Sequence, residues 1–411
     1  MLGLSGGLDS VVLLHVLKEI ESSAGFALSC IHVNHKISKN ADNWADFCKN
    51  LCGIMAVPLE VVEVDISPHL AFGIEAAART ARYAAFEKLD ADHLVLAQHR
   101  DDQAETVLLQ LFRGAGLDGV AAMGVSAPFG KKTLSRPLLS VSRKALEAYA
   151  AEKNLAWVTD ESNSDLRYDR NFVRHELIPA IENRFPACGE TISRSALNFA
   201  ESAALLAELA EIDASGAILD GCLAVSRLNQ LSRARAKNLL RHYLFLKGMK
   251  MPSSRRLEEM LKQMQSPSAC VEHEGFEIRS YRGFVHVVKS LPVPDDFREA
   301  WHGGPRMDIP ALGGVLFFEK KAGGLDPGKL ADVTVRARKG GESLLVHENR
   351  PRRSLKNLFQ EHGIPPWQRK SLPLLYCGEH LVWVPELGLD PDYRAEPGQD
   401  GIVPRWQPIS S

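Results

Sequence analysis

The stretch Met1-Leu2-Gly3-Leu4-Ser5-Gly6-Gly7-Leu8-Asp9-Ser10 decides the fold of this protein. A short apolar run precedes two adjacent glycines, and the apolar pattern at 11–17 follows them, which predicts a strand, a glycine-rich turn and a helix. Glycines let backbone N–H groups converge in such a turn, and the helix start adds unpaired donors with partial positive charge. The stretch therefore predicts an anion cradle of the phosphate-binding type.

Asp9 and Ser10, at the end of this loop, limit the classes of ligand that the cradle could bind. A carboxylate beside a phosphate site repels the ligand unless a cation lies between them, so Asp9 favours a nucleotide with Mg²⁺. The loop is not a Walker A motif, because no Gly-Lys-Ser/Thr follows, and the glycines do not have the dinucleotide spacing G-x-G-x-x-G. On spacing alone, a glycine-rich turn before an ordinary helix stays open as the alternative.

Composition limits the class of protein. The chain has 411 residues, which suggests two or three domains, and its 45% hydrophobic and 24% charged content is ordinary for a globular protein. A net charge of −2 excludes a globally basic nucleic-acid binder, so any such surface is local. Seven scattered cysteines without C-x-x-C indicate a reducing compartment. No stretch reaches transmembrane length, so we expect a cytoplasmic enzyme that does not contact membranes.

The first part of the chain alternates between strand and helix patterns. Apolar β-rich runs are separated by helical patterns, which predicts a parallel sheet covered on both faces, with ligands at the carboxyl ends of its strands. Only four residues precede Ser5, fewer than a buried strand usually needs, so we expect that the true start lies upstream or that the chain is clipped. The expected strands are 28–33, 59–64 and 93–97, and the expected helices are about 40–55, 74–89 and 102–113.

The rest of the chain divides into three further segments. Helical patterns at 190–214, 229–247 and 252–265 precede a hairpin predicted at 276–288. A Pro/Gly-rich stretch follows, and the last part has a mixed pattern. We therefore expect a catalytic α/β domain at 1–185, a mainly helical domain at 186–290, a linker at 291–332 and a small α+β domain at 333–411.

Three carboxylates fall within five residues at Asp101, Asp102 and Glu105, where a helix opens just past a strand end. Acidic residues stabilise a helix N-terminus, so capping is the plain alternative. Clustered carboxylates raise each other's pKa unless a cation lies among them, and this favours a site for Mg²⁺ or for an ammonium group.

Arginines recur on two further helical segments. Glu75, Arg79 and Arg82 share one helical face, either as a solvated ion pair or as a phosphate contact. Within 160–174, Arg170 and Arg174 share a helical face near Tyr168 and Asn171, which suits a phosphate backbone and a splayed base or, alternatively, a plain domain-closing helix.

Taken in order, these segments resemble the tRNA(Ile)-lysidine synthase family within the PP-loop ATP pyrophosphatases. SGGLDS alone is shared by many pyrophosphatases, whereas the motifs at 99–119 and 160–174 are more specific. The resemblance covers nearly the whole chain, although Gln98 stands where relatives often carry a second His. The matching stretches are SGGLDS (5–10), HVNH (32–35), G-x-E-x-x-x-R-x-x-R-Y (73–83), HRDDQAETVLLQLFRGAGLDG (99–119), SRPLL (135–139), DESNSDLRYDRNFVR (160–174), SLKNLF (354–359) and GIPPWQR (363–369).

The resemblance implies a reaction. Members adenylate carbon 2 of the wobble cytidine of an isoleucine tRNA with anticodon CAU, and free L-lysine then displaces AMP to form lysidine. It also implies a PP-loop fold of the adenine nucleotide alpha hydrolase-like type, with ATP and Mg²⁺ as cofactors. The oligomeric state stays open, a homodimer included.

The resemblance also implies residue roles. Asp9, Asp102 and Glu105 would be catalytic, and Asp9 would reach the Mg²⁺. The nucleotide would be bound by Ser5, Gly6, Gly7, Leu8, Asp9, Ser10 and His32. The tRNA and lysine would be bound by His99, Asp102, Glu105, Arg79, Arg82, Arg170, Asn171, Arg174, Arg352 and Arg353.

Local charge supports RNA binding by the last domain. Between Arg336 and Lys370 lie nine Lys/Arg and three Glu, a net charge of +6 in a chain of −2. A solvated basic loop is the plain alternative, but an enzyme that reads one wobble base needs an anchor elsewhere on the RNA. We therefore expect tRNA binding there through Arg352 and Arg353.

Three rival functions remain at this level. A PP-loop tRNA thiolase would need reactive cysteines, usually paired, and none lies in the main motifs. A small-molecule amide-forming ligase would leave the basic C-terminal domain without a purpose. A catalytically silent tRNA-binding protein finds support only in the short first strand.

Overall fold

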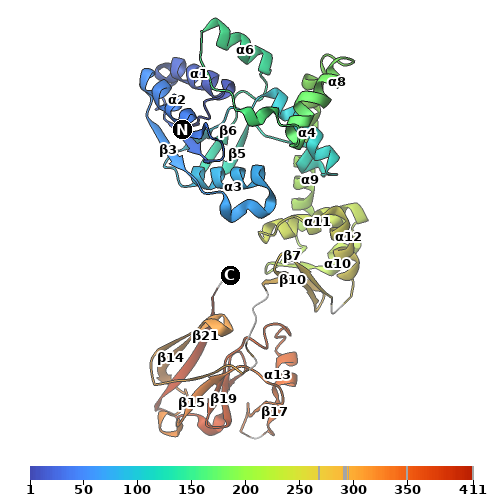
Figure 1. Cartoon of the computed structure of the whole chain (residues 1–411). Helices are drawn as coiled ribbons and strands as arrows, with labels where there is room; N and C mark the ends of the chain where they lie inside the picture. Colours follow the sequence, from blue (N-terminus) through green and yellow to red (C-terminus); the bar gives the residue numbers. More distant parts are fainter. Residues whose placement is uncertain (267–268, 290–293, 295, 349, 410–411) are drawn as a thin grey trace. The chain divides into compact units, whose positions relative to one another are not determined.

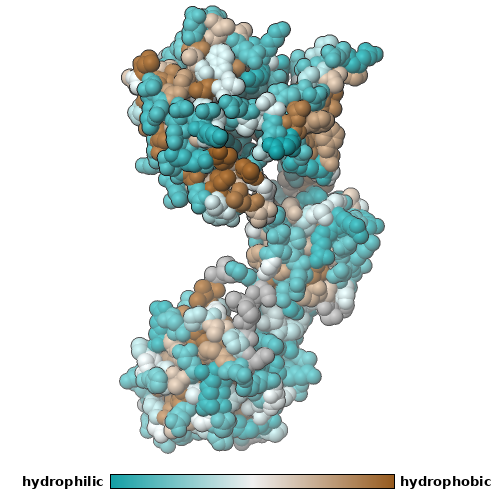
Figure 2. Space-filling view, in the orientation of Figure 1, coloured by the Kyte–Doolittle hydropathy of each residue, from teal (hydrophilic) through white to brown (hydrophobic). Residues whose placement is uncertain are grey.

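The computed structural model describes residues 1–266, 269–289, 294, 296–348 and 350–409 (Figure 1). The chain forms two compact units, Met1–Leu209 and Ala210–Ser411, and each is described by itself. Hydrophilic side chains cover most of the face seen in Figure 2. No helix in the described part of the chain is long and apolar enough to cross a membrane.

The first unit is built on a six-stranded sheet in the order β3-β2-β1-β4-β6-β5. Neighbouring strands run parallel except for β5, which pairs antiparallel with β6. This confirms the predicted parallel α/β domain. The strands are β1 (Leu2–Gly3), β2 (Cys30–Asn34), β3 (Leu59–Glu63), β4 (His93–Val95), β5 (Ser126–Phe129) and β6 (Lys132–Ser135).

Helices cover both faces of this sheet. On one face, α1, α2 and α6 pack on an apolar cluster that includes Leu2, Leu13 and Cys48; on the other, Phe86 of α3 packs on Ile31. Two apolar faces explain why the strands have continuous apolar runs. The helices of this unit are α1 (Leu8–Ala24), α2 (Ala41–Ile54), α3 (Ile74–Glu87), α4 (Arg100–Phe112), α5 (Leu117–Val120), α6 (Arg143–Glu152), α7 (Asp169–Phe172), the π-helical turn Val173–Leu177, α8 (Ile178–Glu182) and α9 (Cys188–Ala214), which extends past the unit's end.

The central strand β1 has only two residues, yet it is paired on both sides, with Leu2 opposite Cys30 and Val95. The terminal amine of Met1 adds a hydrogen bond to the carbonyl oxygen of His93 at 2.8 Å. β1 is therefore a central strand of the sheet. The loop Ser5 to Ser10 follows it at the carboxyl edge of the sheet.

The second unit begins with a five-stranded sheet, β7-β8-β11-β10-β9, packed against three helices. The predicted hairpin is confirmed, because β10 and β11 pair from Phe276 opposite Lys289 to Tyr281 opposite Phe284. The segment has more strand than the helical pattern predicted, since short edge strands carry little periodic signal. Its elements are β7 (Ile218–Leu219), β8 (Cys222–Ala224), α10 (Val225–Gln230), α11 (Arg233–Leu246), α12 (Ser254–Gln263), β9 (Cys270–His273), β10 (Phe276–Tyr281) and β11 (Phe284–Lys289).

The segment expected as a linker is corrected by the structure. Residues 290–293 and 295 lie outside the described residues, but most of 298–322 forms strands that pair with the C-terminal part. Strand β14 pairs along nine residues with β21 at the end of the chain. Gly314 is required there, because a Cβ would lie 2.4 Å from the Trp406 ring. At least Gly314 and Gly324 of the stretch that suggested a linker thus serve close strand packing.

The C-terminal part contains two main antiparallel sheets, β12-β15-β18-β19-β20 and β13-β14-β21, around a core that includes Leu316, Val335 and Val382. A pair of short strands, β16 and β17, precedes α13. The elements are β12 (Arg298–Ala300), β13 (Arg306–Ile309), β14 (Gly314–Ala322), β15 (Val333–Arg336), β16 (Ser343–Leu344), β17 (Arg353–Ser354), α13 (Leu355–Glu361), β18 (Leu374–Cys377), β19 (His380–Val384), β20 (Gly388–Leu389) and β21 (Asp400–Pro408).

Candidate active site

The glycine-rich loop is closely packed and is held by serine hydrogen bonds. Gly6 has φ +84°, and a Cβ there would lie 3.0 Å from Val158 Cγ2 and 3.1 Å from Cys48 Sγ. Ser10 Oγ lies 3.0 Å from Ser5 Oγ and donates to the Gly7 carbonyl oxygen at 2.9 Å. No side chain caps the start of α1 at Gly7, so the first backbone donors of this helix, which follows β1 closely, have no capping partner. The loop therefore has the geometry of an anion site.

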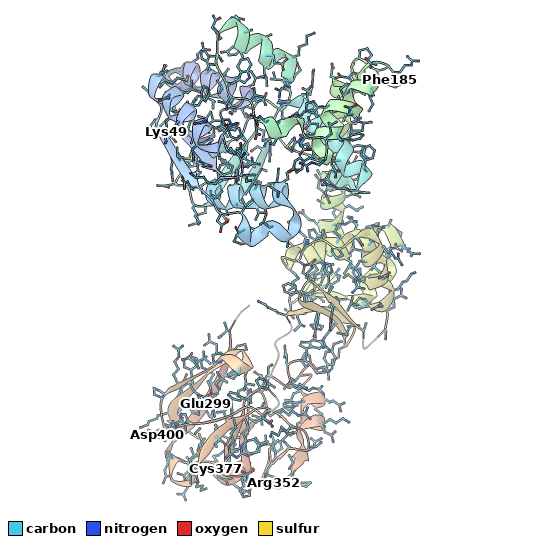
Figure 3. The ribbon with its side chains drawn as sticks, in the orientation of Figure 1. Lys49, Phe185, Glu299, Arg352, Cys377 and Asp400 are labelled. Atoms are coloured by element: carbon cyan, nitrogen blue, oxygen red, sulfur yellow. The ribbon has the colours of Figure 1, made fainter. Side chains whose placement is uncertain are left out.

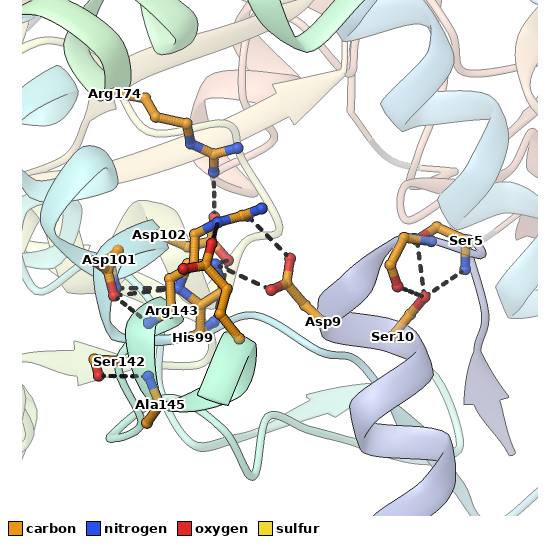
Figure 4. A network of polar contacts seen from close by, with 12 residues as sticks. Ser5, Asp9, Ser10, His99, Asp101, Asp102, Ser142, Arg143, Ala145 and Arg174 are labelled. Atoms are coloured by element: carbon orange, nitrogen blue, oxygen red, sulfur yellow. Dashed lines mark hydrogen bonds and ion pairs between the residues drawn. The ribbon is translucent and has the colours of Figure 1, made fainter. Parts of the chain in front are cut away.

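Asp9 is the charged residue of this loop, and the side chains of His99 and Arg143 lie next to it (Figure 4). Its Oδ1 lies 3.7 Å from His99 Nε2, and its Oδ2 lies 3.6 Å from Arg143 Nη1. Burial raises the pKa of the Asp9 carboxyl, while His99 and Arg143 act against that rise. Asp9 is thus a half-buried carboxyl with its pKa raised by burial and with His99 and Arg143 beside it.

His99 joins Asp9 to the acidic helix. The His99 side chain is fully buried and caps α4, with Nδ1 accepting from the Asp101 backbone N–H at 3.2 Å. The backbone N–H of His99 in turn donates to Asp102 Oδ2 at 3.1 Å, which completes a capping box. Burial lowers the pKa of His99, but the carboxylates of Asp101, Asp102 and Asp9 outweigh it, so that the pKa is raised. The acidic segment therefore caps α4, as the plain alternative predicted, and the same side chains lie next to His99 and Asp9; their role in binding a ligand stays a prediction.

Asp102 and Glu105 form a four-membered ion cluster with Arg170 and Arg174. Arg170 Nε donates to Glu105 Oε2 at 2.7 Å, and Arg170 Nη2 to Asp102 Oδ1 at 3.0 Å. Arg174 reaches the same two carboxylates at 2.5 to 3.1 Å, from the π-helical turn that follows α7. The Glu105 side chain is 1% exposed, and a buried carboxylate without such partners would be costly. Burial lowers the pKa of each guanidinium, and the two carboxylates reverse this and raise it.

Polar atoms without partners gather at the same edge of the sheet. Asp9 Oδ1, His35 Nδ1, Gln98 Oε1 and His99 Nε2 are buried and have no hydrogen-bond partner among the described residues. They follow β1, β2 and β4, which are neighbours in the sheet. Unpaired buried polar atoms are costly, so their convergence favours a polar ligand at this edge.

The other residues expected to bind ligands have different surroundings. His32 is buried below the loop, with Nδ1 2.9 Å from the Leu4 carbonyl oxygen. Asn171 Nδ2 donates to the backbone oxygens of Ser162 and Asp165, so it holds the loop before α7. Arg79 lies over the Tyr83 ring at 4.9 Å. Burial lowers the pKa of Arg82, and Arg79 and Arg170 add to that effect.

The two arginines expected to bind RNA lie in the second unit, and both are ion-paired. Arg352 is labelled in Figure 3. Its Nη2 lies 2.8 Å from Oδ2 of the fully buried Asp390, and Arg353 pairs with Glu361. No sequence pattern indicated these partners, because Asp390 is distant in sequence and carries no motif.

Arg143 was not singled out from the sequence. It follows the helix cap Ser142 in a stretch without a catalytic motif, and only folding brings it to Asp9. The sole signal for it was its place shortly after the SRPLL stretch.

The residues at hand fit Mg²⁺ with a nucleotide. Among the described residues, no group of three or more His, Cys, Asp or Glu side chains could hold a metal ion alone. Mg²⁺ usually takes one or two carboxylates together with substrate phosphates. Asp9, with its unpaired Oδ1 beside the anion cradle, supplies such a carboxylate.

A parallel sheet with this loop at the end of its central strand, next to an acidic helix, defines a PP-loop domain that uses ATP. Residues 1–181 match the family model described as "PP-loop domain". Two further models match, the "TilS substrate binding domain" at 223–286 and the "TilS substrate C-terminal domain" at 333–406.

Full-length relatives define the family more closely. The chain is 42% identical to a tRNA(Ile)-lysidine synthase of Nitrosomonas europaea, over 98% of this chain and 91% of the relative. It is 40% identical to the tRNA(Ile)-lysidine synthase of Ralstonia nicotianae, over 98% and 92% of the two chains. For that of Azoarcus sp. the identity is 36%, over 99% and 91%. The chain belongs to the tRNA(Ile)-lysidine synthase family, which confirms the resemblance and does not favour the thiolase alternative.

Proposed function

We propose that the protein ligates free L-lysine to carbon 2 of the wobble cytidine in the CAU-anticodon isoleucine tRNA of the cytoplasm, converting ATP to AMP and pyrophosphate. Membership of the family supports the reaction type. The observation that carries the proposal in the structure is the position of His99 Nε2, 3.7 Å from Asp9 Oδ1 and 3.5 Å from Asp102 Oδ2. The phosphate loop and the acidic helix thus meet in one site.

The first step is adenylation of the cytidine. The backbone amides at the start of α1 bind the phosphates and stabilise the negative charge of the departing pyrophosphate. Bound Mg²⁺ would neutralise phosphate charge, and Asp9 would hold it. His99, buried between Asp9 and Asp102, keeps both carboxylates oriented toward the reacting groups.

The second step is attack by lysine. An amine attacks only in its neutral form, so a carboxylate that accepts its proton or hydrogen bond promotes the reaction. Both oxygens of Glu105 accept from arginines, whereas Asp102 Oδ2 faces His99 at the start of α4. We therefore assign Asp102 to the contact with the lysine amine and Glu105 to its positioning through Arg170 and Arg174.

The tRNA needs a larger surface than this site. Arg79 and Arg82 of α3 and the basic segment Arg336–Lys370 of the second unit are proposed as phosphate contacts. Such contacts place the anticodon without reading its sequence, and the polar atoms of His35 and Gln98 are available to a flipped base.

The test is incorporation of labelled lysine into unmodified isoleucine tRNA. We expect label in the tRNA only when ATP and Mg²⁺ are present, and none in a methionine tRNA with the same anticodon. Asp102→Asn should lose at least about a hundredfold in rate, as expected for loss of a general base, while Asp46→Asn on the exposed face of α2 serves as a control. Absence of label with the wild-type chain, together with absence of ATP–pyrophosphate exchange, would instead favour a silent tRNA-binding protein.

A further inference from the structure

The nucleotide loop carries no cation of its own. No Lys or Arg occurs before Lys18, and the charged residue within the loop is the carboxylate of Asp9. Sites that release pyrophosphate need positive groups directed at the oxygens where charge develops. Any cationic side chain that assists the α1 amides and Mg²⁺ in this task therefore comes from another part of the fold.

We propose that Arg143 is this side chain and that its guanidinium binds the phosphates that leave as pyrophosphate. Its Nη1 lies 3.6 Å from Asp9 Oδ2, next to the loop, and its side chain is 39% exposed (Figure 4). A planar guanidinium suits phosphate because it presents paired donors. The inference rests on the proposed function, since it takes ATP cleavage to AMP and pyrophosphate as given.

Hydrogen bonds hold the backbone of Arg143 at the site. Its N–H donates to Asp101 Oδ2 at 2.9 Å, and the Val141 carbonyl oxygen accepts from the Arg100 N–H at 2.9 Å. Ser142 Oγ caps α6 by accepting from the Ala145 N–H at 3.2 Å. Arg143 thus starts α6 at a point tied to the start of α4, beside the buried His99.

Arg143 forms two weak ion pairs in the structure, and a bound phosphate could replace both. Besides Asp9, it contacts Glu147 Oε1 through Nε at 3.1 Å, in a pair one helical turn apart. Exposed pairs of this kind contribute less than about 1 kcal/mol. With Mg²⁺ and the triphosphate bound, Asp9 would hold the metal and Arg143 would be available to the phosphates.

His99 and Arg174 also lie near Asp9, but they are less free than Arg143 to turn toward a phosphate. His99 is fully buried at the cap of α4. Arg174 already uses Nε and Nη2 on Glu105 and Asp102. Of the cations that act on the Asp9 carboxyl, Arg143 is the one that is both adjacent and half-exposed.

The experiment is calorimetric titration of the full chain with pyrophosphate, without tRNA or lysine, once with Mg²⁺ and once with EDTA. We expect Arg143→Ala and Arg143→Gln each to weaken pyrophosphate binding by about 10- to 100-fold, as for loss of a charge-assisted hydrogen bond. Lys144→Ala removes the same charge from the neighbouring exposed residue and should change the affinity less than about twofold. Adenosine binding should be unchanged in all three, and equal melting temperatures show intact folding.

A second arm separates direct contact from an effect through Asp9. In EDTA, Asp9→Asn removes a repelling carboxylate and should strengthen pyrophosphate binding. Adding Arg143→Gln to this variant should still cost about tenfold if the guanidinium touches the phosphates. No loss in that background, or wild-type affinity in both Arg143 variants, or no pyrophosphate binding by the wild type in either condition, would overturn the inference. Failure of the wild type to incorporate lysine would instead overturn the proposed function.

Discussion

Arg174 grips Glu105 with two parallel hydrogen bonds, from Nε to Oε1 at 2.5 Å and from Nη2 to Oε2 at 3.1 Å. Glu105 is almost fully buried on α4, and Arg174 lies on the π-helical turn, 69 residues further along the chain. The pair therefore ties the acidic helix to the segment 160–174. Both motifs were expected to contact substrates, and the structure adds that they hold each other.

Removal of the Glu105 charge should destabilise the first unit. Glu105→Ala leaves two partly buried guanidinium groups with one carboxylate, so we expect a loss of about 2–4 kcal/mol, at or below the range for breaking a buried pair because the arginines are partly solvated. Thermal and urea unfolding measure this loss. Asp46→Asn removes an exposed partner of Lys49 and should cost less than about 1 kcal/mol. Equal losses in both variants would contradict the cluster's structural role.

Gly6 should not tolerate a side chain, both because of its positive φ angle and because a Cβ would contact neighbouring residues. Gly6→Ala meets both the positive φ and the contacts with Val158 and Cys48, whereas Gly25→Ala has φ +71° and open space around its Cβ. We expect Gly25→Ala to cost about 1 kcal/mol and Gly6→Ala about 2–3 kcal/mol. Gly6→Ala should also abolish ATP binding, which a fluorescent nucleotide reports. ATP binding by Gly6→Ala at wild-type affinity would contradict the close packing of this loop.

His35 should remain neutral in the folded protein well below pH 6. Burial lowers its pKa to about 4, and the charges of Arg82 and His32 add to the effect. Because the unfolded chain binds the proton from about pH 6.5 downward and the folded chain does not, the stability from neutral His35 is lost as the pH falls from about 6.5 toward 4. NMR titration of the imidazole carbons measures the pKa directly. His35→Asn should flatten the acid side of the stability curve, and a pKa near 6.5 in the wild type would refute the prediction.

Arg352 should influence both stability and tRNA binding, so a single substitution cannot separate these two effects. Arg352→Ala leaves the fully buried Asp390 without its cation, and we expect a lower melting temperature. Adding Asp390→Asn should recover part of that loss, because the buried charge is then gone. If Arg352 binds RNA, tRNA affinity stays reduced in the double variant.

Arg353 offers a cleaner test of the basic segment. Its partner Glu361 is 52% exposed, so Arg353→Ala should change stability by less than about 1 kcal/mol. We expect weaker tRNA binding and a shallower dependence of affinity on salt, by about one unit of slope for each phosphate that Arg353 neutralises in the wild type. Filter binding at several salt concentrations measures both, with Lys250→Ala, far from this segment in sequence, as a charge-matched control. Identical salt slopes in wild type and variant would favour a plain solvated loop.

The sequence by itself determined the strand–loop–helix at 2–24, the parallel sheet and the acidic helix. These follow from local patterns, because apolar periodicity and glycine spacing act over a few residues. The sequence also determined the family, since the motifs of that family occur in the same order along nearly the whole chain.

Only the tertiary structure decided which charges meet. Arg143 reaches Asp9 from 134 residues away, Arg170 and Arg174 close on Asp102 and Glu105, and Arg352 pairs with Asp390. It likewise turned the expected linker into strand β14, whose partner β21 is the end of the chain. Ion pairs and antiparallel strand pairing depend on which segments the fold brings together, and such long-range proximity leaves no local periodic pattern in the sequence.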